Sequence, residues 1–404
     1  MTKTTTRPAS GILSEARELS GWIVGLRRRL HAIPELGYEE HKTSQLIRET
    51  LTELGIPWQG PIAETGVVAT LSGGRGPCVA LRADIDALPI EEQADVPFRS
   101  QHAGRMHACG HDCHTAMLLG AARLLKQRES ELKGTVKLIF QPAEEGLAGA
   151  ERMCHAGVLR DPPVERIFGM HVWPATPTGQ VAGRAGTFLA ATGFMHIVVE
   201  GVGGHAAMPH LTVDPLCTAA KIVVELQTII SREVDPLQSG VVSVTSFHGG
   251  ETTNVIPGEV RLSGTMRSQT LEGLLFLQRR IRELVEGIAA VHRCRARVEF
   301  PGTNFPATVN TPELWDLARE IGSELLGAEA VQESPPVMGG EDFAFYTQQV
   351  PGCFIGLGIR NEELGSTWGL HHPRFLVDEA ALPLGTALHV EFALRSLSEL
   401  ATNR

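Results

Sequence analysis

Short apolar runs alternate with helical patterns through most of this chain, and acidic or histidine residues follow several of the runs. The runs are 79–82, 136–140, 167–170 and 353–357, and the first three are followed by Asp84, Asp86, Glu144, Glu145 and His171. Residues 115–126, between the first two runs, place apolar side chains on one helical face. This alternation predicts an α/β fold in which helices cover a mostly parallel sheet. Because ligands bind beyond the carboxyl ends of such strands, we expect the polar side chains to converge there.

A different order of elements occupies residues 193–304. The expected strands are 194–200, 241–247, 259–266 and 295–300, and the expected helices are 214–231 and 271–291. The order β-α-β-β-α-β is the split βαβ pattern of ferredoxin-like α+β domains. We therefore expect an inserted domain at 193–304, between segments 1–192 and 305–404 of one larger α/β domain.

Composition and charge restrict the possible partners and compartments. With 36 Lys and Arg against 46 Asp and Glu, the formal net charge is −10, which disfavours nucleic acid and acidic membranes as partners. No apolar run approaches the ~20 residues of a membrane span, and the first residues lack the apolar core of a secretory signal. Seven scattered cysteines favour a reducing cytoplasm over a disulfide scaffold. The basic run 27–29 is interpreted as the solvated end of a helix over 13–30.

The densest group of metal-ligating side chains lies in the segment MHACGHDCH. Gly110 permits a tight turn there, so that Cys109 and His111 can face one centre, and thiolate and imidazole suit borderline metal ions. Asp112 is expected to hydrogen-bond a ligand imidazole. One alternative is a helix N-terminus with polar residues by chance. Another is a redox pair of Cys109 and Cys113, although their spacing is not C-x-x-C.

Glu144 and Glu145 follow the strongest strand candidate of the chain. Adjacent residues on an extended backbone point in opposite directions, so one carboxylate can bind a metal ion while the other faces a different part of a cleft. Metal-assisted hydrolysis requires such a free carboxylate, since the ion lowers the pKa of a bound water and the carboxylate takes its proton. The alternative is an acidic first turn of the next helix.

Two histidines, His171 and His371, could complete a metal site. The full candidate set is Cys109, His111, Glu145, His171 and His371. Five ligands are too many for one tetrahedral ion but suit two ions ~3.5–4 Å apart. Asp84 or Asp86 could orient a ligand imidazole or, alternatively, cap a turn.

Further polar residues could contact a substrate. They are His205, Asn254 and Arg267 in the inserted segment and Gly340 in the glycine loop 338–343. An arginine can hold a carboxylate through two parallel hydrogen bonds, and a histidine can stabilise an oxyanion. Each of them, taken alone, is also typical of a surface polar group. The glycine loop does not bind phosphate in the usual way, because no G-x-x-x-x-G-K-[ST] sequence occurs.

The order of these motifs resembles a family of metal-dependent amidohydrolases that includes aminoacylases, hippurate hydrolases and auxin-conjugate hydrolases, and that is related to co-catalytic metallo-carboxypeptidases. The motifs, spread from residue 26 to 397, are RRRLHAIPELGYEE, LRADIDALPI, MHACGHDCHTA, FQPAEEG, GMHVWP, GGHAAMPH, TTNVIP, GTMRS, GGEDFAF and LHHP. The resemblance implies a catalytic α/β domain that holds two divalent metal ions. It also implies that the inserted domain is a lid that commonly pairs two subunits.

The resemblance implies roles for individual residues. The implied metal ligands are Cys109, His111, Glu145, His171 and His371, with Cys109 bridging the two ions. Glu144 would be the general base that activates water and then protonates the leaving amine, and Asp86 would support a ligand. His205 would reach the active site of the partner subunit and stabilise the oxyanion. The implied substrate contacts are Asn254, Arg267 and Gly340.

Asp84 departs from the carboxypeptidase branch, where the resemblance implies a histidine ligand, and this favours the acyl-amino-acid branch. The ligand types leave the metal open between zinc, manganese, cobalt and nickel, with the first two preferred. We expect hydrolysis of N-acyl or N-aroyl amino acids by a cytoplasmic enzyme that dimerises through an edge strand of the insert. The alternatives are a metallo-carboxypeptidase or dipeptidase and, from another class, a non-catalytic ligand-binding or redox protein.

Overall fold

The computed structural model describes residues 10–404, which divide into two compact units. The large unit comprises residues 10–188, 309–335 and 342–404, and the inserted unit comprises residues 189–308 and 336–341. The boundaries expected at 193 and 304 each differ from the observed ones by four residues. No sequence pattern indicated that the short segment 336–341 joins the inserted unit.

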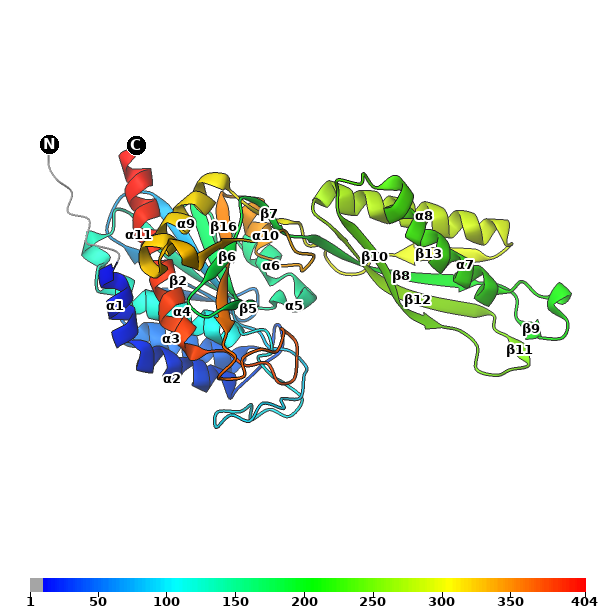
Figure 1. Ribbon diagram of the computed structural model, residues 1–404, viewed down its shortest axis with the longest axis horizontal. Helices are drawn as coiled ribbons and strands as arrows, with labels where there is room; N and C mark the ends of the chain where they lie inside the picture. The colour runs from blue at the N-terminus through cyan, green and yellow to red at the C-terminus, as the bar shows by residue number, and fades with distance from the viewer. Residues whose placement is uncertain (1–9) are drawn as a thin grey trace. The chain divides into compact units, whose positions relative to one another are not determined.

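An eight-stranded sheet forms the centre of the large unit (Figure 1). In spatial order its strands are β1 (Trp58–Ile62), β2 (Gly66–Ser72), β4 (Thr135–Gln141), β3 (Cys78–Asp84), β5 (Arg166–Pro177), β16 (Gly352–Arg360), β6 (Val181–Gly183) and β15 (Val331–Glu333). Strands β4, β3, β5 and β16 run parallel, whereas β1, β2 and β4 pair antiparallel with one another in turn. The predicted mostly parallel sheet is therefore confirmed. Every residue of β3 and β4 is buried, as expected of strands covered on both faces.

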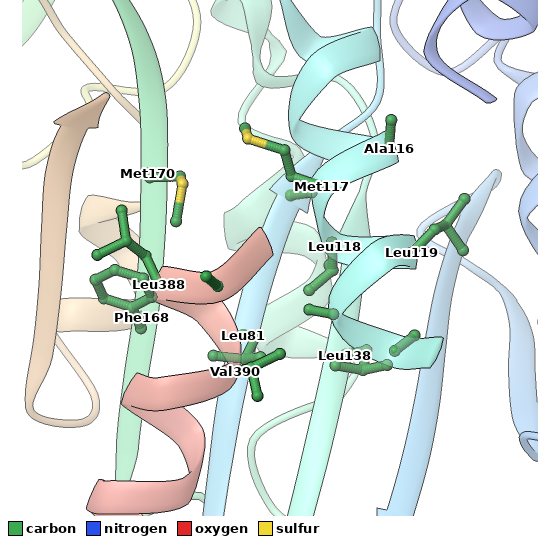
Figure 2. Packing of buried hydrophobic residues seen from close by; sticks show 14 of the residues in the cluster. Leu81, Ala116, Met117, Leu118, Leu119, Leu138, Phe168, Met170, Leu388 and Val390 are labelled. Atoms are coloured by element: carbon green, nitrogen blue, oxygen red, sulfur yellow. The ribbon is translucent and has the colours of Figure 1, made fainter. Parts of the chain in front are cut away.

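Helices cover this sheet. They are α1 (Ser10–Glu18), α2 (Ser20–His31), α3 (His41–Glu53), α4 (His111–Lys126), α5 (Glu144–Leu147), α6 (Gly149–His155), α9 (Pro312–Leu326), α10 (Ala344–Thr347) and α11 (Leu382–Thr402). The single helix expected over 13–30 is thus two helices, α1 and α2. In Figure 2, Leu388 of α11 lies beside Phe168 and Met170 of β5, and all three are buried in one core. Each such side chain contributes ~1.5–3 kcal/mol by leaving water.

Within the inserted unit, two helices pack on a four-stranded antiparallel sheet (Figure 1). In spatial order the strands are β10 (Gly240–His248), β12 (Glu259–Ser268), β8 (Ala191–Glu200) and β13 (Arg295–Glu299), and the helices are α7 (Pro215–Thr228) and α8 (Leu271–Val291). Leu274, Leu277 and Ile281 recur every three or four residues of α8 and are buried against the sheet. The predicted split βαβ order is confirmed.

The remaining strands form two small sheets. They pair β9 (Gly204–His205) with β11 (Val255–Ile256), and β7 (Gly186–Leu189) with β14 (Thr308–Asn310). Among residues 10–404, no helix is both long enough and apolar enough to cross a membrane.

Candidate metal centre

The loop before α4 brings a thiol and an imidazole to one place at the carboxyl edge of the sheet. Gly110, between Cys109 and His111, adopts a left-handed conformation with φ of 82°. A Cβ at this position would lie 2.4 Å from Cγ2 of Val172, so only glycine fits. The tight turn predicted at Gly110 is therefore present, and it precedes the first turn of α4.

Three ligand atoms form a first triad. Those of Cys109, His111 and His171 lie within 4.8 Å of one another, and all three residues are buried. The Sγ of Cys109 is 3.3 Å from Nε2 of His171. Nδ1 of His171 lies 2.7 Å from the backbone oxygen of Val172, which can only accept a hydrogen bond. Nδ1 therefore carries the proton, and the lone pair of Nε2 is free to bind a metal ion.

His171 does not follow its strand, as the sequence suggested, but lies inside it. β5 runs from Arg166 to Pro177 because β16 pairs with it along most of this length, and His171 is opposite Gly356 of β16. The imidazole thus projects from a rigid strand in the middle of the sheet, which fixes its direction.

A second triad shares its thiol with the first. The ligand atoms of Cys109, Glu145 and His371 also lie within 4.8 Å of one another. Nε2 of His371 is 3.4 Å from Oε1 of Glu145, and the backbone N–H of His371 donates to the oxygen of Ala108 at 2.8 Å. The C-terminal loop is therefore tied to the cysteine loop. Cys109 therefore belongs to both triads.

The donor atoms of these triads fit divalent cations. Among residues 10–404, Nε2 of His111 is buried without a hydrogen-bond partner, a state that costs ~1–3 kcal/mol for a polar atom. Although burial opposes its charge, the carboxylates of Asp84, Asp86 and Glu145 raise the pKa of His111 to about 10. Such a surplus of negative charge around one imidazole is balanced naturally by a bound cation.

Asp86 contacts two of the ligand residues. Its Oδ1 lies 3.1 Å from Nδ1 of His111, and its Oδ2 accepts a hydrogen bond from the backbone N–H of Glu145 at 3.0 Å. The first contact keeps a proton on Nδ1 of His111, so Nε2 is the nitrogen that a metal ion would bind, as in many metal-binding histidines.

His114 was in the sequence motif but received no role, and the structure gives it one. Its Nδ1 lies 2.5 Å from Oδ1 of Asp84, and its Nε2 accepts a hydrogen bond from the backbone N–H of Val172 at 2.9 Å. Asp84 also pairs with Arg82 at 2.7 Å. Although burial opposes its charge, His111, His114 and Arg82 together hold the pKa of Asp84 well below the usual range. The spacing of three residues from His111 on a helix is the signal that could have placed His114 at this site.

One expectation about charged residues at α2 and α4 was wrong and another was wrong in part. Asp112 does not contact a ligand imidazole but accepts from Nε of Arg27 at 2.7 Å and lies 2.8 Å from Nδ1 of His31. Arg28 and Arg29 are exposed as expected, whereas Arg27 is 2% exposed, because it pairs with Asp112 where α2 packs against α4. Cys109 and Cys113 are both free thiols, so no disulfide links the proposed redox pair.

Glu144 and Glu145 do not lie on extended backbone as expected. They form a tight turn in which Ala143 and Gly146 have φ values of 55° and 77°. Glu144 is buried, and Oε1 accepts a hydrogen bond from the backbone N–H of Asp342 at 3.3 Å. Oxygens of both glutamates lie within 4.8 Å of a ring nitrogen of His111. The turn therefore brings a second carboxylate beside the ligand triads.

The other candidate residues belong to the inserted unit. His205 is exposed on β9, and the backbone N–H of the next residue donates to the oxygen of Asn254 at 3.0 Å. Arg267 of β12 is partly buried, burial lowers its pKa, and among residues 10–404 no carboxylate pairs with it. A Cβ at Gly340 would lie 2.3 Å from Cγ2 of Thr192, which stands opposite Arg267 in the β8–β12 register. These contacts place His205 beside Asn254, and they place Gly340 near Arg267 through Thr192. None of the four residues is adjacent in sequence to a candidate metal ligand.

Comparison with known proteins decides the family. Residues 80–395 match the model of peptidase family M20/M25/M40. The chain belongs to this family. It is 45% identical over 391 residues to IAA-amino acid hydrolase ILR1-like 4 of Arabidopsis thaliana, covering 96% of this chain and 88% of the relative. Thermostable carboxypeptidase 2 of Saccharolobus solfataricus is 40% identical, covering 95% of this chain and 97% of the relative.

A solved M20 structure agrees with this assignment over nearly the whole chain. The dinuclear metal-binding peptidase of the M20 family from Bacillus subtilis is 37% identical, with a TM-score of 0.81, and the match covers 95% of this chain and 99% of that one. This M20 chain is therefore a metal-dependent amidohydrolase, and its family and ligand triads support two divalent ions.

Proposed function

We propose that this M20 enzyme hydrolyses the amide bond of N-acyl or N-aroyl amino acids and releases a carboxylic acid and an amino acid. The observation that carries the proposal is the buried carboxylate of Glu144, which lies beside two ligand triads that share Cys109. The similarity to a plant IAA-amino acid hydrolase supports an acylated amino acid as the substrate.

The chain would hold the two ions with thiolate, imidazole and carboxylate groups. In the proposal the residues that would hold the ions are Cys109, His111, Glu145, His171 and His371, and Cys109 would serve both because it belongs to both triads. Zinc or manganese is preferred, and cobalt and nickel also suit these ligand types. When bound, divalent ions supply Lewis-acid chemistry, which lowers the pKa of water and polarises the amide carbonyl.

Glu144 moves the protons of the reaction. Its carboxylate takes a proton from the attacking water and later gives this proton to the amine nitrogen that leaves. The backbone N–H of Asp342 holds one carboxylate oxygen, which limits the directions that the side chain can take. Asp86 keeps His111 and the backbone of Glu145 in place during these steps.

The inserted unit is proposed to bind the substrate. Arg267 holds the substrate carboxylate, since a partly buried guanidinium without a carboxylate partner suits an anionic ligand. Asn254 and Gly340 contact the rest of the substrate, and His205 stabilises the oxyanion in the active site of a partner subunit.

A homodimer is part of this proposal. β10 lies at one edge of the four-stranded sheet, where a second copy can add its own strand. Val202, Met208, Leu211 and Val255 near β9 and β11 are 48–69% exposed, as is typical of an interface. The thiol that this proposal makes a metal ligand must stay reduced, which favours a cytoplasmic location.

A carboxypeptidase or dipeptidase is the second candidate, favoured by the 40% identity to a thermostable carboxypeptidase. The test uses N-acetyl, N-benzoyl and indole-acetyl amino acids beside free dipeptides. The protein is stripped of metal and reloaded with zinc, manganese, cobalt or nickel. We expect metal-dependent release of amino acid from an acyl class. Turnover of dipeptides alone would assign the enzyme to the second candidate.

The same assay tests the role of Glu144. We expect Glu144→Gln, with two ions bound, to lower kcat by at least ~10²–10⁴, because proton transfer loses its base. Glu53→Gln, at an exposed position of α3, is the matched control and should keep wild-type kcat. Near-normal turnover of fully metallated Glu144→Gln would show that the base is a different residue.

A further inference from the structure

The turn at residues 143–148, which carries both glutamates, has an unusual backbone conformation. Ala143 and Ala148 have left-handed φ values of 55° and 57°, and Gly146 between them has φ of 77°. A left-handed conformation is unfavourable for a residue with a Cβ, so it persists only where surrounding contacts impose it. The direction of the Glu144 side chain therefore depends on those contacts.

A buried carboxylate meets the first of these residues. Oε1 of Glu40 accepts a hydrogen bond from the backbone N–H of Ala143 at 2.8 Å, and Oε2 accepts one from the hydroxyl of Thr65 at 2.5 Å. Glu40 is 0% exposed and Thr65 is 1% exposed. Because solvent does not reach this carboxylate, the N–H of Ala143 depends on Glu40 for its hydrogen bond.

The rest of the segment 35–40 also lies against this turn. The hydroxyl of Tyr38 donates to the backbone oxygen of Leu147 at 2.9 Å, and a Cβ at Gly37 would lie 2.7 Å from Cδ1 of Leu147. At the other end of the segment, the backbone oxygen of Glu35 accepts a hydrogen bond from the backbone N–H of Ala87 at 2.8 Å. The segment therefore connects the loop after β3 with the turn of the two glutamates.

We propose that Glu40 is a positioning residue for Glu144. The carboxylate of Glu40 holds Ala143 in the left-handed conformation. This conformation directs the side chain of the following residue, Glu144, toward the reacting atoms. The proposal rests on the proposed function, in which Glu144 is the general base. Proton transfer needs a donor and an acceptor within hydrogen-bond reach, so a turn that relaxes by ~1 Å slows the chemical step more than it weakens substrate binding.

The test replaces the carboxylate with groups of similar size. Glu40→Met removes both acceptors, and we expect kcat to fall ~10–100-fold while KM changes less than ~3-fold and two ions stay bound. Glu40→Gln keeps an amide oxygen for Ala143 and an amide N–H for Thr65, so it should restore kcat to within ~3-fold of wild type. Hydrogen exchange of a peptide covering 142–148 should be faster in Glu40→Met and unchanged in Glu40→Gln.

Thr65→Val is the matched control. It removes the other hydrogen bond of the same carboxylate and leaves the contact with Ala143, so we expect near-normal kcat and unchanged exchange of the 142–148 peptide. If Glu40→Met does not fold, Glu40→Asp replaces it, because the shorter side chain withdraws the acceptor from Ala143 with a smaller loss of packing. Equal losses of kcat in Thr65→Val and Glu40→Met would overturn the proposal, as would loss of metal from Glu40→Met alone.

A double-mutant cycle separates this proposal from the proposed function. If Glu40 acts through Glu144, Glu40→Met should change kcat less than ~3-fold in the Glu144→Gln background. A full additive loss in that background would overturn the positioning role. Wild-type kcat in Glu144→Gln alone would instead reject the general base, and the exchange of the 142–148 peptide would still report whether Glu40 holds the turn.

Discussion

His389 of α11 is a buried histidine that the fold keeps uncharged. The side chain is 0% exposed, and neither ring nitrogen has a hydrogen-bond partner within the described part of the chain. Its ring packs edge-to-face with the ring of Phe168, with the two centroids 5.5 Å apart and the two ring planes at 83°. Burial, with a smaller effect of His114, lowers the pKa of His389 from its ordinary 6.5 to about 3. We therefore expect His389 to make the stability of the protein depend on pH.

The sign and size follow from proton linkage. Between pH 6.5 and 3 the unfolded chain binds a proton at His389 that the folded chain does not bind. The stabilisation is fully present above pH 6.5 and is lost as the pH falls toward 3. At pH 5 protonation favours the unfolded state by a factor of about 30, which is a loss of about 2 kcal/mol, and the loss at pH 8 is negligible.

The test is His389→Leu, followed by urea unfolding at pH 5 and pH 8. We take the free energy of unfolding of the variant minus that of wild type. We expect this difference to be about 2 kcal/mol larger at pH 5 than at pH 8, because only the wild type loses stability through His389 at pH 5. Metal ligands titrate in both proteins, so their effect cancels from this difference. His196→Leu, at an exposed position of β8, should show a change below ~0.5 kcal/mol. A pH-independent difference for His389→Leu would refute the reasoning.

Two further perturbations test packing and assembly. A Cβ at Gly358 of β16 would lie 2.0 Å from the backbone oxygen of Pro177, so Gly358→Ala should cost ~3 kcal/mol or more in urea unfolding. Gly287→Ala, in open space on α8, should instead add ~0.5–1 kcal/mol, and equal effects of both changes would contradict this account. Light scattering should give twice the 43.6 kDa chain mass, and a fully active monomer would exclude catalysis by His205 in a partner.

The sequence predicted the inserted unit better than the helices of the large unit. The expected helix 271–291 has the bounds of α8, because one face of α8 is buried and the other is solvated, which gives a clear helical period. In α4, 14 of 16 residues are buried, including the polar residues of its first turn. The helix therefore lacks the alternation of apolar and polar faces from which its first residue could be predicted. The apolar pattern accordingly predicted a helix over 115–126, which begins four residues after the start of α4 at His111.

The sequence predicted which residues come together at the metal centre, but it did not predict the backbone conformation at each of them. Glu145 and His171 followed apolar runs, and the carboxyl edges of parallel strands lie together in any such fold. Cys109, His111 and His371 were instead proposed from their residue types and from the family resemblance. His171 was placed beyond its strand because pairing with β16, which extends β5, is invisible to a local pattern. Glu144 and Glu145 were placed on extended backbone because the left-handed Ala143 depends on a carboxylate 103 residues away.

Buried charges were the least predictable part of the site, and they share a physical cause. A charged side chain is expected in solvent unless its partner is known, and for Arg27 the partner Asp112 is 85 residues away in the chain. The same holds for Glu40, which belongs to the motif RRRLHAIPELGYEE that the sequence left without a role. Burial raises the pKa of Glu40 to about 7, and its two oxygens accept hydrogen bonds from the backbone N–H of Ala143 and the hydroxyl of Thr65. We therefore expect this N-terminal motif to act on catalysis through the backbone of the 143–148 turn.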